Sequence, residues 1–259
     1  MSPDPTHDAQ DELVHLEVAG PVATVTLDSP HNRNALSRRL VTGLHEQLTA
    51  AADSPDVTVV VLRATGTVFC SGADLTEATE GGMEQGARAI VDLQRLVVDL
   101  PVPVVVVVQG AVRAGGIGLV AACDVALTAA EATYALTEVK LGLAPAAISL
   151  TVLPRLTSRA AAWACLSGET FDGTEAAAIG LVTRAVPRDD LEATATAMLA
   201  SLTTGAAQGL RETKALLARD LLARIDQRGD EVAALSARLF GSDAAREAMT
   251  AWLSRPRSR

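Results

Sequence analysis

The stretch between Val104 and Asp124 could carry chemistry, because closely spaced glycines follow a buried strand there. Residues 104–108 are all valine, which is typical of a strand covered on both faces. The glycines that follow are Gly115, Gly116 and Gly118. They let the backbone approach another group closely, and they precede an apolar helix predicted over 119–123. Free N–H groups and the dipole at a helix start favour negative charge, so we expect this corner to stabilise an oxyanion during a reaction.

The same glycines could instead belong to a nucleotide-binding loop, but their spacing argues against it. The segment RAGGIG at 113–118 contains no GxGxxG pattern, and no acidic residue ends a strand about 20 residues later, as a dinucleotide site requires. The GxxxxGK[ST] pattern of a phosphate-binding loop is also absent from the sequence. The sequence therefore disfavours a site that cradles nucleotide phosphates.

The composition restricts the broad class of the protein. The 259 residues suit one large domain, and a hydrophobic content of 49% can build a substantial core. Aromatic residues make up only 2%, so small and β-branched side chains must fill that core. The net charge of −9 disfavours non-specific binding to nucleic acid or to an anionic membrane. The sequence has no apolar run that could span a bilayer and no targeting pattern, so we expect a cytoplasmic protein.

The cysteines and histidines argue against a metal site. Three cysteines lie far apart in apolar surroundings without CxxC spacing: Cys70, Cys123 and Cys165. We expect all three to be buried free thiols in a reducing compartment. The four histidines lie near the N-terminus without metal-ligand spacing: His7, His15, His31 and His45. The sequence therefore predicts no bound metal.

Strand and helix patterns alternate through the first two thirds of the chain, and helices alone fill the last third. Strands are predicted over 14–20, 22–27, 57–62, 104–108, 125–128 and 133–136. Helices are predicted from an N-cap at Ser37 to about 52, over 83–100, from an opening at Pro145, over 158–166, from a cap at Thr174 to Gly180, and over 191–202, 210–225, 230–239 and 244–253. The order indicates an α/β fold with a disordered tail at 1–12, a core at 13–190 and a helical region at 191–259.

Three segments stand out together: FCSGADL at 69–75, QGAVRAGGIGLVAACD at 109–124 and YALTEVKLGLAP at 134–145. As a set they resemble the enoyl-CoA hydratase/isomerase (crotonase) superfamily. The NRNALS loop and the segment FDGTEAAAIGLV at 171–182 agree with the family in order and spacing. The resemblance covers the chain from about Val14 to Leu253. Within the superfamily, TEVKLGLAPAAIS is most similar to methylglutaconyl- and isohexenylglutaconyl-CoA hydratases.

The resemblance implies a crotonase-like spiral of ββα turns with C-terminal helices that pack into a trimer, often a dimer of trimers. It also implies an acyl-CoA thioester as the substrate, with coenzyme A as part of that substrate and no separate cofactor. Two backbone N–H groups of the family, matched by motif to Ala73 and Gly115, would hold the thioester oxygen while it gains charge.

The family's hydratases place two glutamates beside the α,β-double bond, and this sequence matches only one of them. The position three residues after the oxyanion glycine is Gly118 here, whereas the second glutamate is present as Glu138. The resemblance therefore implies an enoyl-CoA hydratase, a lyase of fatty-acid or branched acyl-CoA breakdown, with Glu138 as its single acid/base. Two alternatives stay open: a Δ3-Δ2 enoyl-CoA isomerase, which needs one base, and a non-catalytic acyl-CoA-binding homologue.

Further residues are candidates for contacts with the substrate. By resemblance, Asp74, Leu75 and Thr76 follow the oxyanion alanine and lie along the pantetheine path, although Asp74 is also a candidate helix N-cap. Arg33 is an equal candidate for a contact with CoA phosphates and for an ordinary surface residue. Arg113 stands in an apolar stretch and needs a partner, for which we favour a structural Asp or Glu over a substrate carboxylate.

Overall fold

Two β-sheets form the centre of the fold in the computed structural model, which describes residues 12–74, 77 and 83–253. The larger sheet has the strand order β1-β2-β3-β5-β7-β10, and the smaller has the order β4-β6-β8-β9. The strands are β1 (Val14–Ala19), β2 (Val22–Leu27), β3 (Val59–Ala64), β4 (Val68–Cys70), β5 (Val104–Val108), β6 (Ala111–Arg113), β7 (Val125–Ala129), β8 (Thr133–Ala135), β9 (Phe171–Asp172) and β10 (Arg184–Val186). The tail predicted at 1–12 lies outside the described residues except for Glu12.

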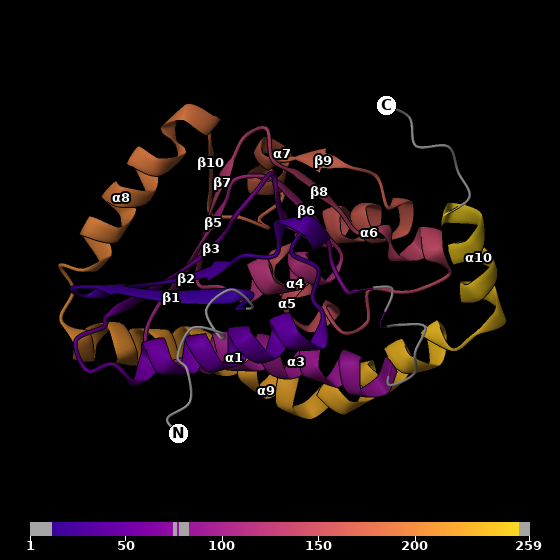
Figure 1. The fold of residues 1–259 in the computed structure, drawn as a ribbon, viewed down its shortest axis with the longest axis horizontal. Helices are drawn as coiled ribbons and strands as arrows, with labels where there is room; N and C mark the ends of the chain where they lie inside the picture. The colour runs from indigo at the N-terminus through magenta and orange to yellow at the C-terminus, as the bar shows by residue number, and fades with distance from the viewer. Residues whose placement is uncertain (1–11, 75–76, 78–82, 254–259) are drawn as a thin grey trace, which may run out of the picture.

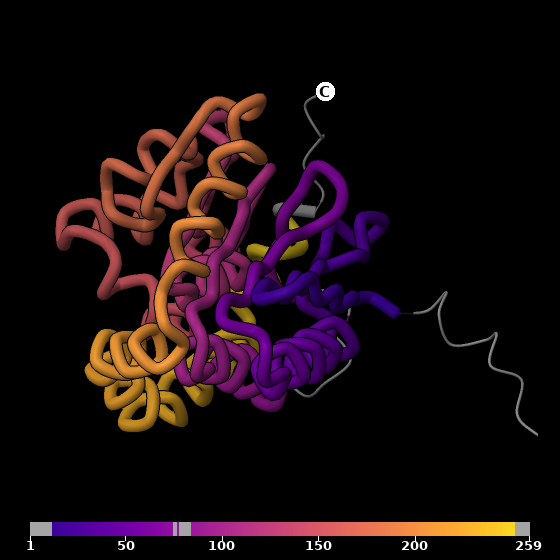
Figure 2. The backbone as a smooth tube through the Cα atoms, turned by 90° about the vertical axis from the view of Figure 1, so that its left-hand side faces the viewer, coloured from indigo at the N-terminus to yellow at the C-terminus, as the bar shows by residue number. Residues whose placement is uncertain are grey.

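Helices flank the larger sheet on both sides. The helices of the described residues are α1 (Arg38–Asp53), α3 (Met83–Asp99), α4 (Gly115–Ala122), α5 (Ser149–Arg155), α6 (Ser158–Ser167), α7 (Gly173–Ala178), α8 (Leu191–Leu202), α9 (Ala207–Phe240) and α10 (Asp243–Leu253), with 3-10 turns η1 (Pro30–Asn32), η2 (Thr137–Leu141) and η3 (Arg188–Asp190). In Figure 1, α1, α3 and α9 lie in a row below the larger sheet, and α8 lies above it. Figure 2, turned by 90°, shows the same separation of α8 from that row.

The central strand β5 is buried along its whole length, as its valine run predicts. It pairs in parallel with β3 and β7, so that Val105 lies between Val61 and Val125. The predicted hairpin of β1 and β2 is confirmed, because the strands pair antiparallel from Val14 opposite Leu27 to Ala19 opposite Val22, with Gly20 at the turn. The sequence patterns do not predict β4, β6, β9 and β10, each of which has only two or three residues.

Several predicted helices have the bounds that the sequence indicates. The Ser37 cap of α1 is confirmed, because its side-chain oxygen accepts a hydrogen bond from the N–H of Leu40 at 3.2 Å. Two other predicted starts are wrong. The chain does not enter a helix at Pro145, because α5 begins at Ser149, and Asp172 rather than Thr174 caps α7. The Asp172 carboxylate accepts the N–H of Glu175 at 2.8 Å, a bond that is available only because the helix begins one residue before Thr174.

The two helices predicted over 210–225 and 230–239 are a single helix of 34 residues, α9. Gly229 lies between the two predicted segments and suggests a helix break in the sequence, but in the structure it lies inside α9. A β-carbon placed on Gly229 would lie 3.1 Å from Val91 Cγ1 of α3. Glycine therefore allows α9 to pack closely on α3, and this packing outweighs the weak helix propensity of one glycine.

A buried ion pair joins α9 to the core. Lys214 is only 3% exposed, and its Nζ lies 2.8 Å from Asp124 Oδ2 at the end of α4. The same ammonium group donates hydrogen bonds to the carbonyl oxygens of Val97 and Val102, both at 3.0 Å. Asp124 Oδ2 also accepts the N–H of Val104 at 2.8 Å. All these partners of Lys214 belong to the core, so they fix the position of the start of α9 relative to the core.

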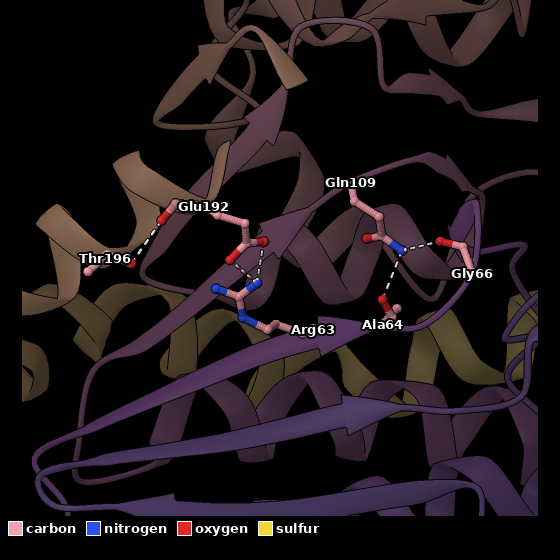
Figure 3. Close-up of polar contacts among 6 residues, drawn as sticks. All are labelled: Arg63, Ala64, Gly66, Gln109, Glu192 and Thr196. Atoms are coloured by element: carbon pink, nitrogen blue, oxygen red, sulfur yellow. Dashed lines mark hydrogen bonds and ion pairs between the residues drawn. The ribbon is translucent and has the colours of Figure 1, made fainter. Parts of the chain in front are cut away.

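Figure 3 shows two sets of polar contacts at the larger sheet. One set joins α8 to β3, and the other joins the end of β5 to the turn after β3. Arg63 of β3 donates to both carboxylate oxygens of Glu192 in α8, at 2.7 and 3.0 Å. Gln109 Nε2, at the end of β5, donates to the carbonyl oxygens of Ala64 and Gly66 at 2.9 and 3.0 Å. These bonds satisfy backbone oxygens where the chain passes from the larger sheet to the smaller one.

The buried ion pair yields a stability prediction. The substitution Lys214→Met should lower the free energy of unfolding by about 3–5 kcal/mol, because it removes the cation that pairs with Asp124 and the donor to two buried carbonyl oxygens. Urea unfolding followed by circular dichroism measures this loss. The matched change at the exposed Lys140, Lys140→Met, should alter it by less than about 0.5 kcal/mol. Similar losses in the two variants would contradict the structural role of Lys214.

Candidate active site

Ala73 and Gly115 lie side by side because three backbone segments meet there. Leu36 and Ala73 form a parallel bridge, in which the N–H of Leu36 donates to Gly72 O at 2.8 Å and the N–H of Asp74 donates to Leu36 O at 3.4 Å. The N–H of Ala73 itself takes no part in this bridge. A β-carbon placed on Gly115 would lie 3.6 Å from the Ala73 nitrogen, so glycine at this position leaves that N–H accessible.

A strained residue turns the chain into α4. Ala114 has φ 44° and ψ −116°, a conformation that residues with a β-carbon rarely adopt. Its N–H donates to Ala135 O of β8 at 3.3 Å, and its β-carbon faces Gly72, where an added β-carbon would lie 3.0 Å away. The helix therefore begins at Gly115 rather than at the predicted position 119. As a result, the Gly115 N–H stands at the open end of α4.

Glu138 is the buried acid of this region. It lies in η2, with 9% of the residue exposed, and its Oε2 has no hydrogen-bond partner among the described residues. Burial raises the pKa of Glu138 to about 7, although a hydrogen bond from its own backbone N–H opposes the rise. At neutral pH the carboxyl group is therefore divided between its acid and carboxylate forms. Such a group can both accept and release a proton.

Ala73, Gly115 and Glu138 line one cavity of about 140 Å³. Apolar side chains make up much of its wall, among them Leu36, Val41, Ile90, Ala146, Ile148 and Phe240. The charged residues on the wall, within the described part of the chain, are Arg38, Asp74, Glu77 and Glu138. The cavity thus places Ala73, Gly115 and the Glu138 carboxyl around a largely apolar space, in which electrostatic interactions are stronger than in water.

Gly118 lies behind this cavity and does not line it. A β-carbon placed on Gly118 would lie 2.5 Å from Ile148 Cγ2 and 3.0 Å from Gln94 Oε1. The Ile148 side chain therefore occupies the space that any side chain at position 118 would need. The resemblance assigns another glutamate to this position. In this protein, position 118 is a glycine, and Ile148 fills the space that a glutamate side chain would need.

The two arginine candidates lie outside the cavity wall. Arg113 Nη1 donates to Val112 O and Thr133 O at 2.9 and 2.6 Å, and Nη2 donates to Thr133 Oγ1 at 3.0 Å. Its partners are thus carbonyl and hydroxyl oxygens of the smaller sheet rather than the predicted Asp or Glu, and burial lowers the pKa of Arg113. The Arg33 side chain is exposed, and its carbonyl accepts the N–H of Ser71 at 3.1 Å.

The residues after Ala73 are described only in part. Asp74 lines the cavity, and its Oδ2 accepts a hydrogen bond from Asn32 Nδ2 at 2.8 Å. The predicted contacts of Leu75 and Thr76, and the helix that Asp74 was expected to cap, involve positions outside the described residues. These expectations therefore stay predictions.

The cysteines differ in burial, and metal ligation finds no support in the described residues. Cys70 and Cys123 are buried and Cys165 is half-buried, so the prediction of three buried thiols is wrong for Cys165. Burial raises the pKa of Cys70 to about 12, which keeps this thiol protonated.

The described part of the chain contains no cluster of His, Cys, Asp and Glu side chains that could hold a metal ion. It also contains no helix long and apolar enough to cross a membrane.

Sequence patterns miss Ile148 and the buried amide beneath it. Gln94 of α3 is 2% exposed, and its Nε2 donates to Ile90 O and Ala147 O at 3.0 and 3.1 Å. Its Oε1 accepts a hydrogen bond from Thr151 Oγ1 at 2.6 Å. The available signal is a glutamine flanked at helical spacing by apolar residues, since a polar side chain on a core-facing helix surface needs partners.

Comparisons with known proteins indicate the family of the chain. A family model described as enoyl-CoA hydratase/isomerase matches residues 17–257. The crystal structure of an enoyl-CoA hydratase from Mycobacterium avium is 47% identical, with a TM-score of 0.88, and covers 94% of this chain and 96% of its own. The mevalonyl-coenzyme A hydratase of Aspergillus fumigatus is 32% identical over 74% of this chain and 73% of that protein.

Other relatives carry different names and lengths. The peroxisomal Delta(3,5)-Delta(2,4)-dienoyl-CoA isomerase of Arabidopsis thaliana is 27% identical over 96% of this chain and 95% of that protein. Vertebrate relatives named enoyl-CoA hydratase domain-containing protein 3, mitochondrial, are 31% identical in Homo sapiens and 32% in Danio rerio. The match spans only 58% and 64% of the length of those two proteins, respectively.

The buried acid predicts a dependence of stability on pH. Below about pH 4.5 the Glu138 carboxyl is protonated in both the folded and the unfolded chain, so burial carries no charge penalty. As the pH rises to about 7, the unfolded chain releases this proton first, and the folded protein loses stability. Above about pH 7, Glu138→Gln should therefore be more stable than the wild type by on the order of 3 kcal/mol.

Urea unfolding of both proteins at about pH 4.5 and at about pH 8 measures this difference. The comparison between the two proteins removes the contributions of the other titrating groups. A difference in unfolding free energy that stays constant with pH would contradict the raised pKa of Glu138.

Proposed function

The chain belongs to the enoyl-CoA hydratase/isomerase family, and on that premise we propose that it adds water to a 2-enoyl-CoA thioester. The observation that carries this proposal is the buried Glu138 carboxyl, whose Oε2 has no partner among the described residues, in the cavity bordered by Ala73 and Gly115. The names of the Mycobacterium avium and Aspergillus fumigatus relatives support hydration. Coenzyme A is part of the proposed substrate, and no separate cofactor is proposed.

The N–H groups of Ala73 and Gly115 hold the thioester oxygen in this proposal. When water attacks the β-carbon, the electrons of the double bond move toward that oxygen, which gains negative charge in the transition state. The bridge to Leu36 and the strained Ala114 fix the two donors before the substrate arrives. Donors already in place need no reorganisation during the reaction, so they stabilise the transition state more than the ground state.

Glu138 moves the proton in both halves of the reaction. As a carboxylate it accepts a proton from the water that attacks the β-carbon. As the resulting acid it then delivers a proton to the α-carbon, so one water is added and Glu138 returns to its starting form. A pKa of about 7 suits this cycle, because both forms are well populated near neutral pH.

A Δ3-Δ2 enoyl-CoA isomerase is the second candidate, and the position of Ile148 favours it. Because Ile148 fills the space beside Gly118, no second acid/base stands there to position a water. Moving a proton from the α-carbon to the γ-carbon, or back, needs one base and no water. The Arabidopsis thaliana relative is named as an isomerase. A purely non-catalytic binding role is disfavoured by Glu138, since an unpartnered buried carboxyl costs stability without aiding binding.

We also propose that the protein is cytoplasmic and assembles as a trimer or a dimer of trimers. Large apolar side chains on α6 and α9 are 63% to 75% exposed in the single chain: Trp163, Leu166, Leu216 and Leu217. Contacts between copies would remove such surface from water, which favours association. Light scattering on the purified protein measures the assembly.

The reaction is tested with crotonyl-CoA and a 3-enoyl-CoA in ¹⁸O-labelled water. A hydratase should form a labelled 3-hydroxyacyl-CoA from crotonyl-CoA. Glu138→Gln should lower kcat by about 10²–10⁴, because the proton-transfer group is lost, while binding of butyryl-CoA stays unchanged. Glu169→Gln, at an exposed position, is the control and should keep the wild-type rate. Unlabelled conversion of the 3-enoyl-CoA alone would establish the isomerase instead, and no turnover would favour the binding role.

The oxyanion donors are tested by bulk at Gly115. A β-carbon there would lie 3.0 Å from Leu36 Cδ1 and 3.6 Å from the Ala73 nitrogen, at the place proposed for the thioester oxygen. Gly115→Ala should therefore lower kcat by about 10²–10³. Gly209→Ala is the matched control, because a β-carbon on Gly209 would meet nothing within 4 Å. If Gly115→Ala keeps the rate of this control, the donors lie elsewhere.

A further inference from the structure

We infer that Ile148 ends the acyl part of the cavity, and that the cavity accordingly takes a short, uncharged acyl chain. This inference rests on the proposed function, because it concerns the acyl group of the same thioester. Its evidence is separate from the proton chemistry: it comes from the packing around Ile148 and from the charges on the cavity wall.

The Ile148 side chain separates the cavity from α4. Ile148 lines the cavity and is 3% exposed, while its Cγ2 and Cβ would lie 2.5 and 2.8 Å from a β-carbon on Gly118. Gly118 offers no side chain of its own to close this side. The space beyond the cavity is therefore filled by Ile148, and a shorter residue at position 148 would extend the cavity as far as the α4 backbone.

Hydrogen bonds hold the segment that carries Ile148. The carbonyl of the preceding residue, Ala147, accepts a bond from Gln94 of α3 at 3.1 Å, and its N–H donates to Ser236 Oγ of α9 at 3.3 Å. Thr151 bonds to Gln94 Oε1 at 2.6 Å and lies 3.2 Å from Gly118 O. The segment is thus tied to three helices, so Ile148 cannot easily swing aside to admit a longer chain.

The cavity volume matches a short acyl chain. The volume of about 140 Å³ includes the space beside Ala73 and Gly115 that the thioester would occupy, so only part of it is left for the acyl chain. A chain several carbons longer would have to displace Ile148 from its contacts with α4.

The charges on the wall disfavour a second carboxylate on the acyl chain. The basic residue among the described lining residues is Arg38, whose side chain is 61% exposed and lies 3.6 Å from Glu77. The other charged groups on the wall are Asp74 and Glu138, which are acids. Arg113 does not line the cavity. A terminal carboxylate would therefore enter an apolar space bordered mainly by acids.

Binding of saturated acyl-CoA thioesters to the full chain, measured by calorimetry, tests the length limit. Wild-type affinity should rise from butyryl-CoA to hexanoyl-CoA and fall about tenfold for decanoyl-CoA. In Ile148→Ala, decanoyl-CoA should bind at least as tightly as hexanoyl-CoA. Val152→Ala removes a similar buried group outside the cavity and should keep the wild-type order. If Ile148→Ala does not fold, Ile148→Val should show a smaller shift in the same direction.

The same measurement with valeryl-CoA and glutaryl-CoA, which differ mainly by a terminal carboxylate, tests the charge limit. Glutaryl-CoA should bind about tenfold more weakly. Equal affinity for these two ligands, or an unchanged length order in the Ile148 variants, would overturn the inference. None of these ligands reacts, so the outcome is distinguishable from a failure of the proposed hydration: loss of turnover with intact length selection would reject only the reaction.

Discussion

The parallel bridge between Leu36 and Ala73 is the contact on which the site depends. It brings the segment after β4 against the segment before α1, and the two sheets hold both segments next to the start of α4. This arrangement places Ala73 and Gly115 on the wall of the same cavity. The strained backbone of Ala114 completes the approach, and its hydrogen bond to β8 helps to offset the cost of that conformation.

The apolar cavity wall determines how the acid behaves. Glu138 lines a cavity whose wall is largely apolar, and burial there raises the pKa of its carboxyl group. The nearby Gln94 is a polar group, but its amide is satisfied by backbone oxygens and by Thr151. A satisfied amide can stay buried without drawing water into the cavity. The electrostatics of the site therefore depend on residues that carry no charge.

The sequence predicted those parts of the protein that depend on local pattern or on a complete motif. The β5 valine run, the β1–β2 hairpin and the Ser37 cap each express a local rule, and the motifs indicated Ala73, Gly115 and Glu138, which the structure brings to one cavity. The failures depend on tertiary contacts.

Gly229 stays helical because α3 packs against it, and Arg113 finds carbonyl oxygens that only the folded sheet presents. Ile148, just before α5, fills the space beside Gly118 in α4. The two residues are 30 positions apart in the sequence, so no local pattern predicts their contact. In each case the deciding partner is remote along the chain, so the residue's own neighbourhood carried too little information.

The length of α9 carries an evolutionary consequence. Lys214 fixes the helix to the core near its start, and Ser236, 22 positions later, holds the cavity segment through Ala147. The two contacts are about 33 Å apart along a continuous helix, at about 1.5 Å per residue. Inserting or deleting one residue between them would rotate the second half by about 100° and turn Ser236 and Phe240 away from the cavity. Natural variation in this family branch should therefore preserve the number of residues between these two positions even where their identities drift, and length changes should gather in the loops outside α9.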